Sequence, residues 1–268
     1  MTGQKSITFV AAVNSREILE NNLLASPCFR KPHPYQILIQ EGYSSASKAY
    51  NDAIDKSQND LIVFVHQDIV LPEQWISDLQ RALECLDQDD PEWGVIGSYG
   101  ETLNDRGRGY VYSSGRGIIG KPFERPARIQ TLDEIVLIIR KSSGLRFDNT
   151  LPHFHFYGAD ICMTAEQMGK KNYAISAFCV HNTQQNWVLG PEFYQCYRHI
   201  KRKWRKSLPI QTTCTRVTRF DRPMYRRRLG EIYLKYFRRS GFVGNRARDV
   251  QKLLGEVDTL LAGEHQPS

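Results

Sequence analysis

A short apolar run that ends abruptly in polar residues most constrains what this chain can fold into. Residues 61–65 are β-branched, leucine or aromatic, a run too short for a helix but typical of a strand buried on both faces of a parallel sheet. His66, Gln67 and Asp68 follow at once. Ligands bind at the carboxyl ends of strands in open α/β sheets, so this carboxylate and imidazole are candidates for chemistry. A capped loop without a function is the alternative.

Strand-like and helix-like segments alternate around this run. Residues 6–13 and 34–40 have the composition of buried strands, and a helix-like segment follows each of them, the first with an N-cap at Asn14-Ser15. This alternation predicts an α/β fold with a mainly parallel sheet. Residues 98–130 are rich in Gly, Arg and Ser and are expected to form a long loop. No GxGxxG follows the first strand and no GxxxxGK[ST] occurs, which argues against a dinucleotide site or a P-loop.

A second informative stretch begins with an aromatic turn. Residues 153–160 contain His, Phe, Tyr and Gly before Asp160, and the apolar positions that follow have helical spacing. Asp160 is therefore expected in the first turn of a helix, where the helix dipole favours an ionised carboxylate. An ordinary aspartate at a helix start is the alternative. The next predicted strand, residues 173–180, ends in His181.

The length and composition fit one large domain with a smaller appendage. The apolar runs fall far short of the roughly 20 residues that span a bilayer, and the first five residues lack the apolar region of a signal peptide, so we expect a cytoplasmic protein. The 6 cysteines include no CxxC pair and predict neither a disulfide framework nor a zinc site.

The positive charge of the chain belongs to its C-terminal third. Residues 191–268 hold 18 Lys and Arg against 7 Asp and Glu, so they carry +11, whereas residues 1–190 carry −4. We therefore predict a first domain over residues 1–190 and a basic helical extension over residues 191–268. The partner of a basic surface could be anionic lipid, nucleic acid or an acidic polymer.

Residues 193–206 predict a basic amphipathic helix, with further helices at 225–237 and 247–261. Its aromatic and apolar positions are Phe193, Tyr197, Ile200 and Trp204, and its cations are Arg198, Lys201, Arg202 and Arg205. Such a face would attract anionic lipid headgroups or a lipid-diphosphate acceptor, which predicts association with the inner face of a membrane. Packing of the aromatic stripe on the first domain, with merely solvated cations, is the alternative.

Together these motifs resemble the inverting, family-2-type nucleotide-sugar glycosyltransferases of the A-type fold. Phe64-Val-His-Gln-Asp68, Tyr157-Gly-Ala-Asp160 and the strand ending in Val180-His181 look closest to the StrF-like branch, and the resemblance covers roughly residues 6–185. It implies an A-type domain that moves a sugar from a nucleotide-diphosphate donor, a uridine nucleotide among the candidates. A glycan, lipid-linked or small-molecule hydroxyl would accept the sugar, as in polysaccharide biosynthesis, and nucleic acid is not the expected partner.

The resemblance also implies a divalent metal, Mn²⁺ or Mg²⁺, bound by Asp68 and His181. A metal held by a carboxylate and an imidazole can neutralise the charge that develops on a diphosphate leaving group. The chain departs from the usual Asp-x-Asp because His66 stands where the first carboxylate would be. Mg²⁺ prefers oxygen ligands and Mn²⁺ tolerates imidazole, so His66 as a third ligand favours Mn²⁺.

The remaining roles are also carried by the resemblance. Asp160 looks like the catalytic base, with Ala159 in place of the usual Glu, and losing that neighbouring charge predicts an Asp160 that is ionised at neutral pH. The positions expected to hold the nucleotide sugar are Ala12, Asn14, Glu41, Lys48, Asn51 and Gln67.

Two other functions compete with this interpretation. A catalytically weak or inactive protein of the same fold could act as a nucleotide-sugar or anionic-surface binding module, and metal-dependent hydrolysis of a nucleotide sugar would separate it from a transferase. A nucleotidyltransferase is disfavoured because no Gly-rich loop follows the first strand.

Overall fold

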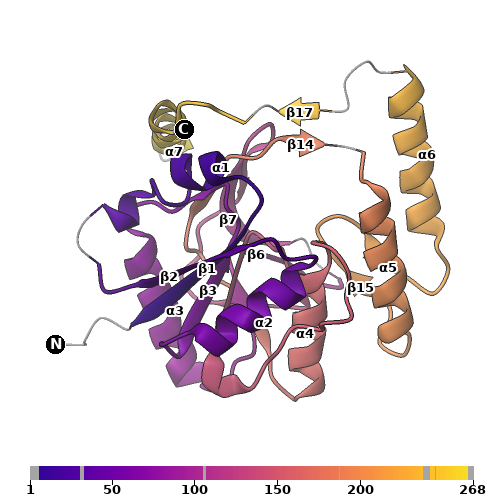
Figure 1. Cartoon of the computed structure of the whole chain (residues 1–268), viewed down its shortest axis with the longest axis horizontal. Coiled ribbons are helices and arrows are strands. Elements are labelled where there is room, and N and C mark those ends of the chain that lie inside the picture. The colour runs from indigo at the N-terminus through magenta and orange to yellow at the C-terminus, as the bar shows by residue number, and fades with distance from the viewer. Residues whose placement is uncertain are drawn as a thin grey trace.

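The computed structural model describes residues 6–30, 33–104, 107–186, 188–237, 242–244 and 246–264. The first five residues and parts of the predicted extension (238–241, 245 and 265–268) lie outside this range. Two layers of helices enclose a central sheet, and a second sheet stands beside it (Figure 1). Within the described residues, no helix combines the length and apolarity that a bilayer crossing needs.

The central sheet has seven strands in the order β2-β1-β3-β11-β5-β12-β9. Their bounds are β1 Ile7–Val13, β2 Gln36–Glu41, β3 Leu61–Val65, β5 Ile96–Gly97, β9 Ala127–Ile129, β11 Val136–Arg140 and β12 Asn172–Ala174. β1 pairs in parallel with β2 and β3, as predicted, and β5 pairs in parallel with β12. β11 is antiparallel to both β3 and β5, so the sheet is mixed rather than mainly parallel across its second half.

Both faces of β3 are buried, which confirms the first prediction. Ile62 and Phe64 belong to one hydrophobic cluster and Val63 and Val65 to the other. Helices α2 (Ala46–Lys56) and α4 (Tyr157–Gln167) pack on the first side, and α1 (Arg16–Asn21) and α3 (Trp75–Asp89) pack on the second. Ser15 caps α1, as predicted, by accepting a hydrogen bond from the backbone N–H of Ile18. The helices thereby leave the carboxyl ends of β1, β2 and β3 at one edge.

The long loop expected over residues 98–130 is wrong, because this segment contains three strands of a second sheet and one strand of the central sheet. The sheet runs β10-β6-β7-β13-β4, with β8 paired to β7. Its strands are β4 Ile69–Val70, β6 Tyr99–Glu101, β7 Arg108–Ser113, β8 Gly117–Gly120, β10 Thr131–Leu132 and β13 Cys179–His181. Gly115 and Gly117 have φ of 78° and 72° in the β7–β8 turn, a conformation that suits glycine. The glycines that suggested a loop therefore shape a hairpin.

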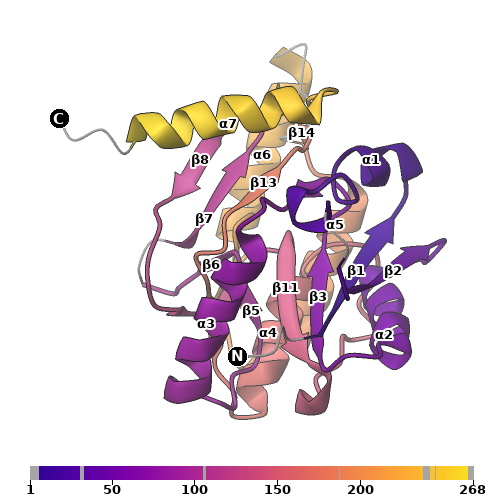
Figure 2. The same ribbon diagram turned by 90° about the vertical axis from the view of Figure 1, so that its left-hand side faces the viewer.

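The C-terminal elements wrap around both sheets. They are β14 Gln185–Asn186, α5 Pro191–Lys203, β15 Ile210–Gln211, β16 Arg216–Val217, α6 Arg222–Phe237, β17 Phe242–Gly244 and α7 Val250–Glu264. Helix α7 lies across the second sheet, where Val250, Leu253 and Val257 pack on Tyr110 and Val180 (Figure 2). Helix α5 packs against the α4 side of the first core cluster, and α6 lies outside α5 (Figure 1). The division at residue 190 stays a prediction.

Candidate functional site

The fold brings His66, Asp68 and His181 together. His66 and Asp68 follow β3, while His181 ends β13, which pairs with β4 so that His181 lies opposite Ile69. The backbone N–H of Asn182 also donates to the carbonyl of Asp68 over 2.9 Å. One ligand atom from each of the three side chains lies within 4.8 Å of the others, which fits a shared metal ion. This arrangement supports a metal role for the three predicted residues.

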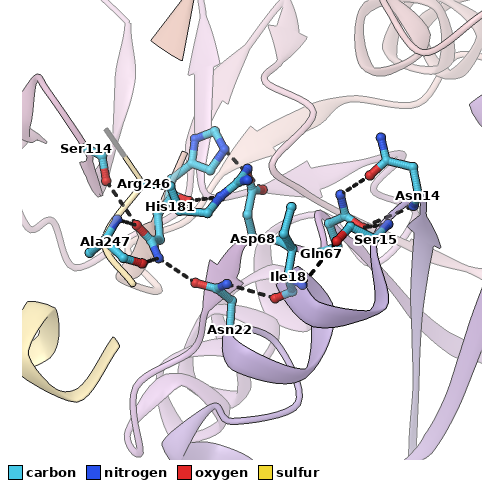
Figure 3. Close-up of polar contacts among 11 residues, drawn as sticks. Asn14, Ser15, Ile18, Asn22, Gln67, Asp68, Ser114, His181, Arg246 and Ala247 are labelled. Carbon is cyan, nitrogen blue, oxygen red and sulfur yellow. Dashed lines mark hydrogen bonds and ion pairs between the residues drawn. The ribbon is translucent and has the colours of Figure 1, made fainter. Parts of the chain in front are cut away.

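Asp68 is held between His181 and Arg246 (Figure 3). His181 Nε2 lies 3.4 Å from Asp68 Oδ1, and Arg246 Nη2 donates to Oδ2 over 2.9 Å. Burial alone would raise the pKa of the Asp68 carboxyl, but His181, His66 and Arg246 outweigh it and hold that pKa well below its usual range. Asp68 is therefore a permanent anion, as a metal ligand must be.

His66 is partly buried, between the end of β3 and the start of α4. Burial lowers its pKa despite the nearby Asp68 carboxylate, so the neutral imidazole is favoured, and neutral imidazole is the form that binds metals. Its Nε2 lies 2.7 Å from the hydroxyl of Tyr157, the first residue of α4. The two imidazole rings of His66 and His181 are 5.9 Å apart between centroids. Tyr157 therefore orients His66 within the cluster.

Gln67, between the two ligands, ties the end of β3 to the end of β1 (Figure 3). Its Oε1 accepts from the backbone N–H groups of Asn14 and Ser15 over 3.1 and 3.2 Å, and its Nε2 donates to Asn14 Oδ1 over 2.5 Å. The local reason is that β1 and β3 run in parallel and end side by side. Gln67 and Asn14 thus hold each other at the edge of the sheet where β1 and β3 end.

A cavity of about 620 Å³ opens beside the metal cluster. Among the predicted residues, Ala12, Asn14, Glu41, His66, Gln67 and Asp68 line it. Glu41 faces Arg16, whose Nε and Nη2 donate to its two oxygens over 2.7 and 2.8 Å. The strand ends therefore deliver most of the predicted nucleotide-sugar positions to one place.

Lys48 and Asn51 are not among the residues that line this cavity. The Asn51 amide donates to the carbonyl of Phe147 over 2.8 Å and accepts from its N–H over 3.0 Å, a bracket that holds the loop before α4. Lys48 Nζ donates to Ser44 on the exposed side of α2. The structure therefore does not bring Lys48 and Asn51 into the cavity at the strand ends, and their role in donor binding stays a prediction.

Asp160 is the largest departure from the expected site. It lies in the first turn of α4, as predicted, but it is 1% exposed and does not line the cavity. Its oxygens accept from Lys203 Nζ over 2.8 Å and from Trp204 Nε1 over 2.7 Å. Burial raises the pKa of the Asp160 carboxyl, although Lys203 and Trp204 oppose that shift. The structure therefore shows a buried carboxyl with two protein partners, and its role as the base stays a prediction.

Helix α5 also departs from the expected membrane-facing surface. Its aromatic and apolar positions, Phe193, Tyr197, Ile200 and Trp204, are all buried in the first core cluster. Lys201 pairs with Asp221, and Lys203 pairs with Asp148 as well as Asp160. The alternative interpretation of residues 193–206, packing on the domain, is therefore correct for the aromatic stripe.

Arg246 and Glu134 were missed from the sequence. Arg246 reaches Asp68 because the side chain of Asn182 holds the next residue, Ala247, through its N–H over 2.7 Å and its carbonyl over 2.9 Å (Figure 3). No periodicity marks an arginine in an irregular segment as part of a site. Glu134 precedes β11 and accepts from the backbone N–H of Gly158 at the start of α4. The Asp133-Glu134 pair directly before a buried strand was the available signal.

Three comparisons with known proteins found relatives of this chain. A family profile described as "Glycosyltransferase like family" matches residues 8–207. The protein "ATP synthase subunits region ORF 6" of Fuscovulum blasticum is 29% identical over 167 residues, which are 55% of this chain and 61% of that relative.

Two solved structures resemble this chain at low identity. GalNAc-T7 with UDP, GalNAc and Mn²⁺ matches 88% of this chain and 57% of that chain, with a TM-score of 0.50 and 10% identity. PcManGT of Pyrobaculum calidifontis, with GDP-Man and Mn²⁺, matches 77% and 65% with a TM-score of 0.48 and 12% identity. In each case the chain spans less than two thirds of the relative's length. Because the family profile covers most of the sequence, the chain belongs to the glycosyltransferase-like family, with the A-type nucleotide-sugar transferase fold that its motifs predicted.

Proposed function

We propose that this protein is an inverting glycosyltransferase that moves a sugar from a nucleotide diphosphate to a hydroxyl group of a glycan, lipid-linked or small-molecule acceptor. The observation that carries the proposal is the His66–Asp68–His181 cluster at the strand ends, beside a cavity lined by Ala12 and Asn14. A transferase of this kind needs a cationic site for the diphosphate next to a pocket for the nucleoside. The cavity offers both.

For the donor we propose a uridine nucleotide with Mn²⁺, the pair named for the GalNAc-T7 structure. Asn14 and Glu41 offer amide and carboxylate groups to a base and a ribose at the rim of the cavity. One carboxylate and two imidazoles suit Mn²⁺ better than Mg²⁺. When bound, the ion would offset the charge that develops on the leaving diphosphate. Arg246, which contacts Asp68, adds a fixed positive charge from the protein itself.

The test is donor binding measured by calorimetry with and without Mn²⁺. We expect Asp68→Asn and His181→Ala to weaken the binding of uridine diphosphate in the presence of Mn²⁺ and to leave little metal-dependent difference. His199→Ala is the matched control, because His199 Nε2 also faces an aspartate, Asp148, over 3.2 Å but lies outside the cavity. If His181→Ala binds nucleotide and metal as the parent does, the metal assignment is wrong.

The competing proposal is a binding module without turnover. Arg246 favours it, because a guanidinium already pairs with the carboxylate that would bind the metal. Purified protein incubated with uridine diphosphate sugars and Mn²⁺ separates the two functions. Slow release of free sugar that disappears in Asp68→Asn supports a transferase, whereas tight binding without any release or transfer supports the module.

A further inference from the structure

A second carboxylate lies at the start of α4, and it comes from the segment just before β11. Asp160 is engaged by Lys203 and Trp204 on the far side of the helix. Glu134, just before β11, instead directs its Oε1 to the backbone N–H of Gly158 over 3.2 Å. A helix N-terminus favours an ionised carboxylate, because its first N–H groups have no partner within the helix. Glu134 therefore occupies the place at which the sequence pattern suggested a base.

Gly158 is the reason that Glu134 can lie there. A Cβ atom at position 158 would meet Glu134 Cγ at 3.0 Å and the carbonyl of Leu132 at 2.9 Å. Any side chain at this position would have to share the space that Glu134 fills. The glycine and the glutamate are thus complementary in shape, because the missing side chain at position 158 leaves the space that the Glu134 side chain occupies.

Glu134 is also connected to the metal cluster. The Tyr157 hydroxyl contacts His66 Nε2 over 2.7 Å and lies 3.4 Å from the carbonyl oxygen of Glu134. Glu134 is partly exposed, whereas Asp160 is 1% exposed, and neither is among the residues that line the cavity. Burial, reinforced by Asp133 and opposed by the N–H groups of α4, raises the pKa of Glu134 to about 8. A carboxylate with a raised pKa is a stronger proton acceptor than an ordinary one, and its deprotonated fraction grows as the pH rises towards and past 8.

We propose that the Glu134 carboxylate is the general base of the transfer reaction. It takes the proton of the acceptor hydroxyl while the acceptor oxygen bonds to the anomeric carbon of the donor. The bond between that carbon and the diphosphate breaks, and its electron pair leaves with the nucleotide. This inference rests on the proposed transferase function, and it assigns to Asp160 the task of holding α5 against α4.

The experiment measures transfer and donor binding in the same variants. Glu134→Gln keeps an oxygen for the Gly158 N–H, so it should fold, bind uridine diphosphate and Mn²⁺ as the parent does, and lose transfer by at least about 100-fold. Glu101→Gln is the matched control. Burial and Asp133 raise the pKa of that carboxyl too, but it lies on β6, and its variant should keep parental transfer.

Near-parental transfer by Glu134→Gln would overturn the proposal, as would lost transfer in Asp160→Asn at unchanged thermal stability. If the parent binds donor but transfers to no acceptor, the transferase function itself fails, and the base assignment fails with it.

A second, independent observation concerns α6, which exposes its apolar side. Tyr225, Leu229 and Tyr233 are 66%, 67% and 60% exposed and recur every four residues along the helix. Phe220, Ile232 and Tyr236 extend this stripe. The opposite face carries the buried Glu231, which accepts from Tyr194 of α5 over 2.5 Å. A contiguous exposed apolar stripe of this kind marks a surface that binds something.

The charges beside the stripe indicate what it binds. Arg222, Arg226 and Arg228 flank it and are exposed, and among the described side chains of α6 the one acidic group, Glu231, is buried. Nearby, Arg205, Lys206 and Arg219 line a small basic cavity. A second copy of α6 would bring arginines against arginines, whereas anionic headgroups would pair with them. Tyrosine and arginine beside an apolar stripe also suit the boundary between headgroups and acyl chains.

We infer that α6 docks on an anionic lipid bilayer, with the stripe in the interface and the arginines on headgroup phosphates. The parent should cosediment with vesicles of phosphatidylglycerol and phosphatidylcholine and not with phosphatidylcholine alone. Binding should be abolished in a triple variant of the stripe, Tyr225→Ser with Leu229→Ser and Tyr233→Ser. In a triple variant of the arginines, Arg222→Gln with Arg226→Gln and Arg228→Gln, the vesicles should be released at a lower salt concentration than they are from the parent. Absence of binding at low salt overturns the inference. The inference is also overturned if the parent sediments as a dimer and the serine variant sediments as a monomer.

Discussion

Helices α5 and α6 follow each other in the basic C-terminal part of the chain and have similar compositions, yet the structure uses them in opposite ways. In α5 the aromatic stripe is buried and the cations meet acids of the domain, whereas in α6 the apolar stripe faces outward. Asp148, Asp160 and Asp221 lie within reach of α5. The difference teaches that a basic amphipathic pattern predicts an apolar stripe along a helix, but does not predict whether the stripe packs on the domain or stays exposed.

The contacts of α5 explain why it stays against the domain. Trp204 is buried with its indole N–H on Asp160, and Lys203 joins Asp160 to Asp148. A buried carboxylate with charged and neutral donors is stable only while those donors remain. On α6, by contrast, Arg227 and Tyr194 satisfy Glu231 without burying the apolar stripe. Substitutions should therefore be costly on α5 and nearly neutral on α6.

The largest effect is expected for Trp204→Ala. It removes a buried indole and leaves Asp160 without one donor, so the free energy of unfolding should fall by about 3–5 kcal/mol. Tyr233→Ala, which removes an exposed aromatic ring from α6, should change it by less than about 0.5 kcal/mol. Chemical denaturation of both variants measures the contrast. Equal losses would mean that α6 is as firmly packed as α5.

A smaller loss is expected for Lys203→Met. The lysine is 29% exposed at its side chain, so solvent screens part of the attraction, and a loss of about 1–3 kcal/mol follows from removing a hydrogen bond to a charged group. Lys206→Met is the matched control, because Lys206 is exposed on the turn after α5. A parental unfolding curve for Lys203→Met would show that Trp204 alone holds Asp160.

The smallest effect is expected in how the free energy of unfolding depends on pH in acid. Burial would raise the pKa of Asp148, but Thr150, Lys203 and His199 together hold it well below its usual range. An acid whose pKa is depressed by folding adds stability above its unfolded pKa, and that stability is lost as pH falls from there towards the folded pKa. Asp148→Asn should therefore flatten the fall in unfolding free energy below about pH 4. If the unfolding free energy of Asp148→Asn falls below pH 4 as steeply as that of the parent, Asp148 does not contribute to holding α5 against the domain.

Much of the fold and part of the site could be predicted because they depend on local pattern. The apolar run of β3 is buried on both faces, and the polar residues after it line a cavity. His181 joins them because the strand before it ends at the same edge. The loop expected over residues 98–130 was wrong because glycines permit a tight hairpin as readily as an irregular loop.

By itself the sequence determined where strands end and which polar side chains follow them, since a continuous apolar run and its abrupt end are properties of neighbouring residues. Only the tertiary structure decided that Glu134 meets the start of α4 while Asp160 is held by Lys203 and Trp204, because the first turn of a helix can direct an aspartate to either side. It also decided that Arg246 meets Asp68, 178 residues away, and that α5 is covered while α6 is not. These outcomes depend on which surfaces meet when distant segments pack, and no local pattern contains that information.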